Sequence, residues 1–162
     1  MEASHSPFLS KPEELAEHLV TVKKTISANA QKDSDNVAVV KKYFEALRSG
    51  KFELLNDLFA DDIVWHQPGN GQLSGLHSGK PAVFNLFGRF GKISQGSFKI
   101  DSVANVMENG NWVTATLHFS ATANDKAISM DGVDLMRIEN GKIKEVYLFS
   151  ADQDAEDKFW VD

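Results

Sequence analysis

A tyrosine lies among apolar residues in the first half of the chain, where its phenol could donate a hydrogen bond. The spacing of Val40, Phe44 and Leu47 predicts a helix over residues 36–49 with one apolar side. Tyr43 is adjacent to that side, so its ring can point into the core. A buried phenol needs a polar partner for its hydroxyl group, and Tyr43 is therefore a candidate site residue.

An aspartate occupies a similar position later in the chain. If residues 127–138 form a strand, Asp134 shares a face with the apolar residues Met130 and Met136. Carboxyl groups are rarely buried without a partner, so an acid on this face indicates a functional site. The alternative is a bulge at Gly132 that turns Asp134 toward water.

Two histidines are candidates for moving a proton. Trp65, His66 and Gln67 follow one another at the end of an expected strand, where His66 could take a proton or only satisfy a turn. His118 alternates with polar residues along another expected strand, and this alternation leaves open which face meets a pocket.

The residues around these groups predict an apolar pocket. Polar side chains at such a pocket would serve to hold or react with a bound small molecule. The expected ligand contacts are Trp65, Gln67, Phe84, Phe87, Met130, Val146 and Ser150.

The composition argues against several other classes of function. Among 162 residues, 17 Lys and Arg face 23 Asp and Glu, and the net charge of −6 opposes binding to nucleic acids or anionic membranes. The chain has no cysteine and no dinucleotide or P-loop motif, so we expect no cofactor. The histidine spacing does not match a zinc site, so we expect no metal. Without an apolar span or a signal-like N-terminus, the protein is expected in the cytoplasm.

The order of the expected elements predicts an α+β fold. Residues 1–35 should hold a polar tail, an extra helix and a linker, and residues 36–162 the main domain. A short helix over 52–59, ended by Ala60-Asp61-Asp62, should precede a strand over 63–66 and a glycine-rich loop. The remaining elements are a helix from about residue 80 and strands over 97–107, 112–123, 127–138 and 143–150, separated by turns that include Asn-Gly.

Two stretches resemble the SnoaL-like polyketide cyclase and ketosteroid isomerase families of the nuclear transport factor 2-like fold. They are YFEALRSGKFELLNDLFADDIVWHQPG (43–69) and GVDLMRIENGKI (132–143), within a likeness that covers residues 36–160. The chain is particularly similar to a subgroup whose first strand reads Trp-His-x-Pro-Gly. The resemblance implies a cone-shaped α+β barrel: a strongly curved mixed or antiparallel sheet wrapped around N-terminal helices, with an internal apolar pocket. It also implies a homodimer, for which strand faces carrying Trp112 and Phe119 are candidates.

The resemblance implies roles for individual residues as well. Tyr43 matches the oxyanion-hole tyrosine of the isomerases, and Asp134 matches its partner aspartate, which an apolar site keeps protonated. The isomerases' catalytic aspartate corresponds to Gln67, whose amide cannot act as a base, so steroid isomerisation by that mechanism is not expected. In the cyclase branch, an aspartate on this strand works with a histidine, as Asp134 could with His66 or His118.

The resemblance therefore implies that the pocket takes a small apolar molecule bearing a carbonyl or hydroxyl group, whose oxygen Tyr43 and Asp134 would hold. If the protein is catalytic, the expected reaction is an isomerisation or cyclisation by proton abstraction next to the carbonyl, which a positioned side chain accelerates by roughly 10² to 10⁴. A non-catalytic ligand-binding or dimerisation module of the same fold is the alternative.

Overall fold

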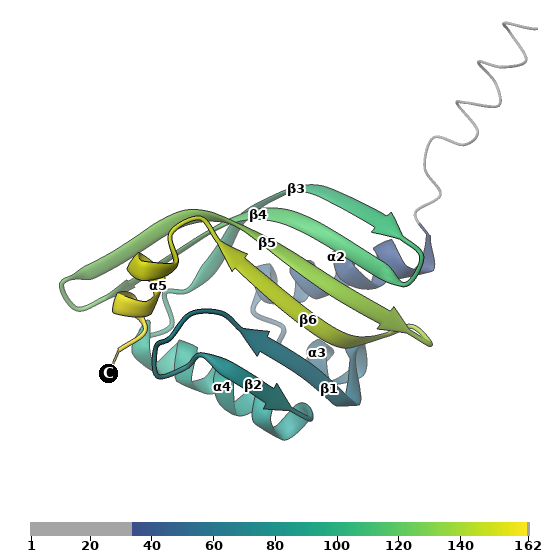
Figure 1. Ribbon diagram of the computed structural model, residues 1–162, viewed down its shortest axis with the longest axis horizontal. Coiled ribbons are helices and arrows are strands. Elements are labelled where there is room, and N and C mark those ends of the chain that lie inside the picture. Colours follow the sequence, from purple (N-terminus) through teal and green to yellow (C-terminus); the bar gives the residue numbers. More distant parts are fainter. Residues whose placement is uncertain (1–33, 162) are drawn as a thin grey trace, which may run out of the picture. The chain divides into compact units, whose positions relative to one another are not determined.

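The computed structural model describes residues 34–161 (Figure 1). The extra helix that we expected within residues 1–35 lies outside these residues. Three helices and two strands come first, four consecutive strands follow, and a short helix comes last among the described residues. In chain order the elements are α2 (Asp35–Ser49), α3 (Glu53–Leu58), β1 (Phe59–Gln67), β2 (Gly75–Ser78), α4 (Lys80–Ile93), β3 (Lys99–Asn109), β4 (Trp112–Ala123), β5 (Lys126–Glu139), β6 (Lys142–Ser150) and α5 (Gln153–Phe159).

The six strands form one mixed sheet that is curved but does not close on itself. Their order across the sheet is β2-β1-β6-β5-β4-β3, and every neighbouring pair is antiparallel except β1 and β6, which are parallel. The expected meander of alternating strands is confirmed. At the β5–β6 turn, Asn140 and Gly141 have positive φ angles of 51° and 72°, which suit the twist of a tight hairpin.

Helix α2 is held at both ends by local hydrogen bonds. The hydroxyl group of Ser34 accepts a bond of 3.1 Å from the backbone N–H of Val37. The helix ends at Gly50, whose left-handed backbone (φ 68°) lets its N–H reach carbonyl groups of the last turn. The side of the helix that faces the sheet buries Val40 and Tyr43, so the inward orientation predicted for Tyr43 is confirmed.

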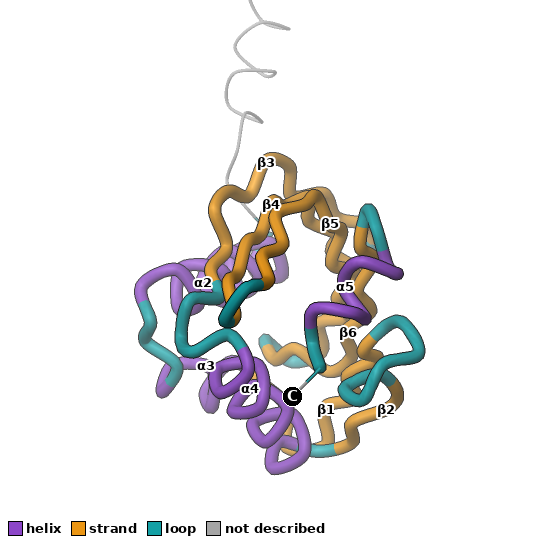
Figure 2. The backbone as a smooth tube through the Cα atoms, turned by 90° about the vertical axis from the view of Figure 1, so that its left-hand side faces the viewer, coloured by secondary structure: helices purple, strands orange, loops and turns teal. Residues whose placement is uncertain are grey.

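The helices complete the cone that the sheet begins. Helix α2 packs against strands β3 to β6, and α4 packs against β1 and β2. Figure 2 shows the strands as an arc, with α2, α3 and α4 along its open side. The sheet and helices together therefore form the expected α+β cone. None of the helices in residues 34–161 is both long and apolar enough to cross a membrane.

The first strand begins earlier than expected. Ala60-Asp61-Asp62, which we expected at a helix end, lies within β1, which starts at Phe59. The pairing of β1 with β6 is irregular between Phe59 and Val64, and both aspartates are exposed. This irregular stretch lacks the apolar alternation that marks a regular strand, which explains the error.

Two short elements were also missed. Strand β2 lies in the expected glycine-rich loop, and its four residues are too exposed to show an apolar alternation. Helix α5 has seven residues, and the side chain of Asp152 caps it by accepting from the backbone N–H of Ala155 at 2.9 Å. A helix of seven residues makes only about two turns, so the spacing of its apolar residues gives too little periodicity to predict it from the sequence.

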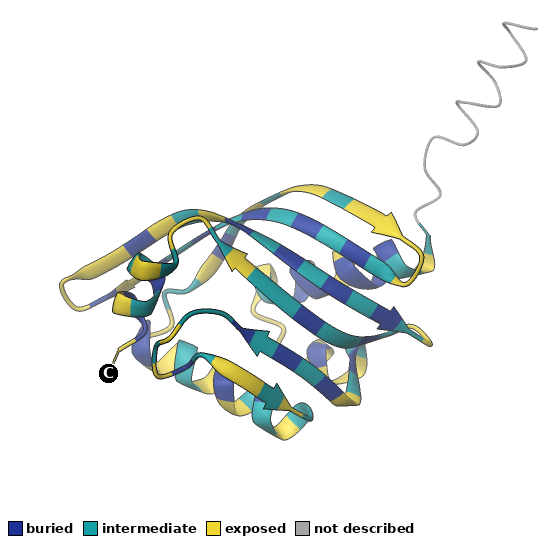
Figure 3. Cartoon of the chain, viewed as in Figure 1, coloured by how far each residue is buried: buried dark blue, intermediate teal, exposed yellow. Residues whose placement is uncertain are grey.

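The inner face of the sheet and the facing sides of the helices form the core (Figure 3). Along β4, buried residues alternate with partly exposed ones. Phe119 belongs to the buried set and is 6% exposed. This corrects the expectation that Phe119 lies on an exposed strand face: Phe119 belongs to the face of β4 that packs into the core, whereas Trp112 lies on the opposite face and is partly exposed.

Candidate functional site

A cavity of about 410 Å³ lies inside the cone. Aromatic side chains make up much of its wall, and two of them, Phe52 and Phe149, are more than half exposed, so the cavity reaches the surface beside them. Its larger apolar lining residues are Leu47, Phe52, Trp65, Phe84, Phe87, Phe90, Phe98, Ile100, Leu117, Phe119, Leu148, Phe149 and Trp160. Its polar side chains are Tyr43, Gln67, Ser94, Asp134, Ser150 and Glu156.

Tyr43 and Asp134 both line this cavity. Tyr43 is 2% exposed and Asp134 is 8% exposed. The pairing of β4 with β5 runs without a register shift from one end to the other, so the bulge considered at Gly132 does not occur and Asp134 faces inward. Within residues 34–161, neither the phenol of Tyr43 nor the carboxyl group of Asp134 has a hydrogen-bond partner. Every side-chain polar atom there that is fully enclosed does have a partner. The oxygen atoms of these two groups are therefore not fully enclosed but open to the cavity that both residues line.

Burial decides the protonation of this pair. It raises the pKa of Asp134 to about 8, and the charge of Glu156 adds to the effect. The carboxyl group is consequently mostly protonated at neutral pH. Burial also raises the pKa of Tyr43 well above its ordinary value, with a further contribution from Asp134. The two residues thus present two O–H donors to a largely apolar space.

A second carboxyl group, Glu156 from α5, lines the cavity and was not anticipated. It is 6% exposed and accepts four hydrogen bonds. The indole N–H of Trp160 donates to Oε1 at 3.2 Å, and the hydroxyl group of Ser150 donates to Oε2. The side-chain amides of Gln67 and Gln153 donate from 3.4 Å each. Reading the last segment as a helix would have found this residue, because Glu156 and Trp160 are four apart and share a face.

Gln67 connects Glu156 to the first strand. Its amide oxygen accepts from the indole N–H of Trp65 at 3.1 Å, and its amide nitrogen donates to Glu156. Trp65, Gln67 and Ser150 all line the cavity, as do Phe84 and Phe87. These five expected contact residues are therefore in place around one space.

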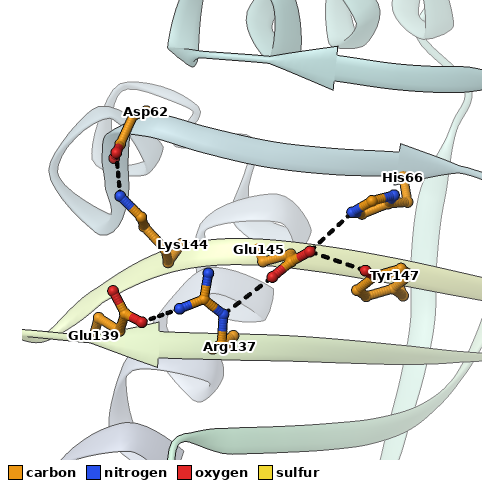
Figure 4. A network of polar contacts seen from close by, with 7 residues as sticks. All are labelled: Asp62, His66, Arg137, Glu139, Lys144, Glu145 and Tyr147. Atoms are coloured by element: carbon orange, nitrogen blue, oxygen red, sulfur yellow. Dashed lines mark hydrogen bonds and ion pairs between the residues drawn. The ribbon is translucent and has the colours of Figure 1, made fainter.

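His66 lies on the outer face of the sheet, away from the cavity. Its Nε2 is 3.0 Å from Glu145 Oε1, and its ring stacks on Tyr147 with 3.9 Å between ring centroids (Figure 4). Burial raises the pKa of Glu145, but hydrogen bonds from Tyr147, His66 and Arg137 outweigh it, so the net effect lowers the pKa. His66 belongs to this outer network rather than to the pocket.

His118 also faces outward, on β4. Its Nδ1 is 2.7 Å from Asp131 Oδ1, and its Nε2 is 2.9 Å from Ser129 Oγ. The sequence of contacts from Ser129 through His118 to Asp131 is that of the Ser-His-Asp triad of hydrolases. In those enzymes the aspartate is buried, whereas Asp131 is 82% exposed on the outer face of the strand. Neither His118 nor His66 is among the residues that line the cavity. The geometry does not support either as a base in the pocket.

Two further expected contacts lie apart from the cavity. Val146 is fully buried in the core, beside Trp65 in the sheet, and Met130 is partly buried beyond the section of β5 that lines the space. The expected face was right for Met130 but not its position along the strand. Within the described residues, no group of three or more His, Asp or Glu side chains is placed to hold a metal ion.

A curved sheet and helices around an apolar cavity are the architecture of a small-molecule-binding domain. Residues 40–146 match the family model of the SnoaL-like domain. The chain belongs to the SnoaL-like family.

Solved structures support this assignment. A protein with a cystatin-like fold from Xanthomonas campestris is 43% identical, with a TM-score of 0.76 over 78% of this chain and 98% of the other. Bal32a, from a soil-derived mobile gene cassette, is 27% identical, with a TM-score of 0.74 over 78% of this chain and 97% of its own. An NTF2-like protein from Anabaena variabilis shares the fold at 19% identity, with a TM-score of 0.64 over 75% of this chain and 94% of its own. The resemblance to the SnoaL-like family and the nuclear transport factor 2-like fold is confirmed, whereas the likeness to the ketosteroid isomerases and to the subgroup with the Trp-His-x-Pro-Gly strand stays a prediction.

Proposed function

We propose that the cavity binds a small, mostly apolar molecule through a carbonyl or hydroxyl oxygen. The observation that carries this proposal is the pair Tyr43 and Asp134, two O–H donors that line one apolar space without a partner in residues 34–161. A ligand oxygen would supply the missing acceptor. In a site of low dielectric constant, each such hydrogen bond is stronger than in water.

The same pair would favour acid–base chemistry on a ketone. When a proton leaves the carbon next to a carbonyl, negative charge gathers on the carbonyl oxygen, where the two donors can stabilise it. A positioned donor of this kind contributes about 3 to 4 kcal/mol to lowering the barrier. The proposed reaction is an isomerisation or cyclisation without a cofactor. Steroid isomerisation with a base at position 67 is not part of it, because Gln67 carries an amide.

A non-catalytic ligand-binding module is the second candidate. The observation that favours it is the same amide at Gln67, which leaves the position of the isomerases' catalytic aspartate without a proton acceptor. The two candidates differ in one measurement: exchange of the protons next to the carbonyl of β-tetralone with solvent deuterium, followed by NMR. Exchange that the protein accelerates supports the catalytic hypothesis, whereas binding of the ketone without acceleration of exchange supports the hypothesis of a non-catalytic binding module.

The binding proposal is tested with β-naphthol, an apolar ring system with one hydroxyl group. Calorimetric titration should show binding to the wild-type protein, and Tyr43→Phe and Asp134→Leu, which each remove a donor, should weaken it by several-fold to about tenfold through loss of one hydrogen bond. Tyr147→Phe and Asp131→Leu make the same chemical changes on the outer face and should leave affinity unchanged. Equal affinity in all four variants would contradict the proposal.

We further propose that the outer face of the sheet forms a homodimer contact. Trp112 and Tyr147 lie 6.4 Å apart between ring centroids, and Met107, paired with Thr114 on the same face, is 53% exposed. Light scattering should give twice the mass of one chain, and Trp112→Glu should halve it. A single-chain mass for the wild type at micromolar concentration would refute this contact. A cytoplasmic location stays a prediction from composition.

A further inference from the structure

We propose that Glu156 is the general base of this site, the group that takes the proton from the carbon next to the ligand's carbonyl. The proposal rests on the function proposed above and adds the residue that this function lacks. It places the base on helix α5. Gln67, on strand β1, cannot be the base because its side chain is an amide.

The two carboxyl groups that line the cavity within residues 34–161 have opposite surroundings. Asp134 has no hydrogen-bond partner there, whereas Glu156 accepts from Trp160, Ser150, Gln67 and Gln153. Hydrogen bonds to a carboxylate favour its charged form, and burial without them favours the neutral form. Carboxyl groups that share a site but differ in this way can take the acid and base roles separately. Asp134 is thus suited to donate a proton and Glu156 to accept one.

The contacts of Glu156 hold it in place yet leave it able to react. The bonds from Trp160 and Ser150 anchor the two carboxylate oxygens separately. The amide contacts from Gln67 and Gln153 are 3.4 Å long, beyond the usual range of about 2.7 to 3.2 Å for N–H···O bonds. A carboxylate oxygen can therefore exchange a weak amide contact for an incoming proton while the anchoring bonds remain.

The electrostatic surroundings make Glu156 a stronger base than an exposed glutamate. Burial raises its pKa, hydrogen bonds from Ser150 and Trp160 oppose that rise, and the charge of Asp157 reinforces it. The titratable groups that face the site from the other elements are Tyr43 on α2 and Asp134 on β5. A base with a raised pKa transfers protons more effectively near neutral pH.

The step that we propose is a simple proton transfer. The C–H bond next to the carbonyl breaks, and its proton moves to a carboxylate oxygen of Glu156. The bond's electron pair forms the carbon–carbon double bond of the enolate, and the charge moves to the carbonyl oxygen between Tyr43 and Asp134. Return of the proton to the same or a conjugated carbon completes exchange or isomerisation, with no oxidant or reductant consumed.

The first experiment compares two carboxylate-to-amide changes on the same helix. Glu156→Gln should slow deuterium exchange into β-tetralone by roughly 10² to 10⁴, while calorimetry still shows β-naphthol binding. Asp154→Asn, at an exposed position of α5, is the matched control and should leave the exchange rate unchanged. Retained β-naphthol binding and an unchanged circular dichroism spectrum show that the Glu156 variant is folded.

The second experiment alters the base without removing it. Ser150→Ala deletes a hydrogen bond that lowers the pKa of Glu156, so the acid limb of the exchange-rate profile should move to higher pH. A purely structural role for the contact would change the rate by a similar factor at every pH. This variant keeps the carboxylate and decides the matter even if Glu156→Gln does not fold.

The results separate failure of this proposal from failure of the binding function. If the wild-type protein does not bind β-naphthol, the proposed function itself is wrong. If the protein binds β-naphthol but never accelerates exchange, it is a binding module and Glu156 is not a base. If exchange persists in a folded Glu156→Gln variant, or the acid limb is unmoved in Ser150→Ala, another group takes the proton. Loss of exchange together with a shifted acid limb supports the assignment.

Discussion

The indole N–H of Trp65 donates to the amide oxygen of Gln67 across 3.1 Å, and this contact determines which way the amide points. Because the oxygen is occupied, the amide nitrogen faces Glu156 at 3.4 Å. Gln67 therefore acts as a link between the first strand and α5, and the residue is 6% exposed in that position. A residue that looks like a lost base in the sequence is, in the fold, a support for another carboxyl group.

Replacing Gln67 with leucine should destabilise the protein. The change leaves the buried N–H of Trp65 without an acceptor, which costs about 1 to 3 kcal/mol of unfolding free energy. Urea denaturation measures the loss. The variant Trp65→Phe/Gln67→Leu removes both partners, and its cost should be smaller than the sum of the two single changes. Simple additivity would mean that the contact contributes nothing.

The stability of the protein should fall as the pH rises from about 4 to about 8 and should level off above that range. Burial holds the pKa of Asp134 near 8 in the folded protein, far above that of a carboxyl group in an unfolded chain. Between the two values the folded state holds a proton that the unfolded state has lost, so unfolding becomes easier with each increase in pH. Melting curves across this range should show the decline in the wild type and a much smaller one in Asp134→Asn. Parallel curves would argue against a buried acid.

Neither outer histidine should be needed at the site. His66→Ala breaks the contact with Glu145, and His118→Ala breaks those with Asp131 and Ser129, but both side chains face away from the cavity. Affinity for β-naphthol and exchange of β-tetralone should match the wild-type values. Loss of exchange in either variant, with binding intact, would restore that histidine as the proton acceptor.

A methyl group at Gly132 should disturb the cavity wall. The added carbon would lie 3.1 Å from the backbone oxygen of Phe149 and 3.4 Å from the ring of Phe119. Overpacking of this kind costs about 1 to 3 kcal/mol, which exceeds the roughly 0.4 to 1 kcal/mol gained when alanine replaces a glycine. Gly132→Ala should therefore lower the melting temperature and weaken β-naphthol binding. A variant as stable as the wild type would show that the neighbouring residues of the cavity wall can shift to accommodate the methyl group.

The features that the sequence revealed are those with a regular period. The alternation in β4 and β5 placed Asp134 on the inner face, and the helical spacing around Tyr43 directed its ring inward. Both follow from local geometry that a sequence carries in full. The family resemblance supplied the closure of the cone, which no local pattern contains.

The position of His66 could have been predicted from the sequence. Strand alternation places Trp65 and Gln67 on one face of β1 and His66 on the other, so a pocket lined by the first two excludes the histidine. The role of Glu156, in contrast, depends on which segments meet in space. Glu156 was overlooked because its value as a site residue comes from donors on three separate segments: Gln67, Ser150 and Trp160. Such convergence has no signature along the chain.

The parallel pairing of β1 with β6 has a consequence for how the molecule is made. β1 lies between β2 and β6 in the sheet. It cannot pair with β6 until residues 142–150 have left the ribosome, and these begin some 75 residues after the end of β1. Contacts between such distant parts of a chain form slowly, since a long loop must close first. During synthesis, the hairpin of β1 with β2 and the hairpins of β3 to β5 can form early, while the edge of β1 that pairs with β6 lacks its hydrogen-bond partner. This parallel contact is therefore expected to be among the last parts of the sheet to form.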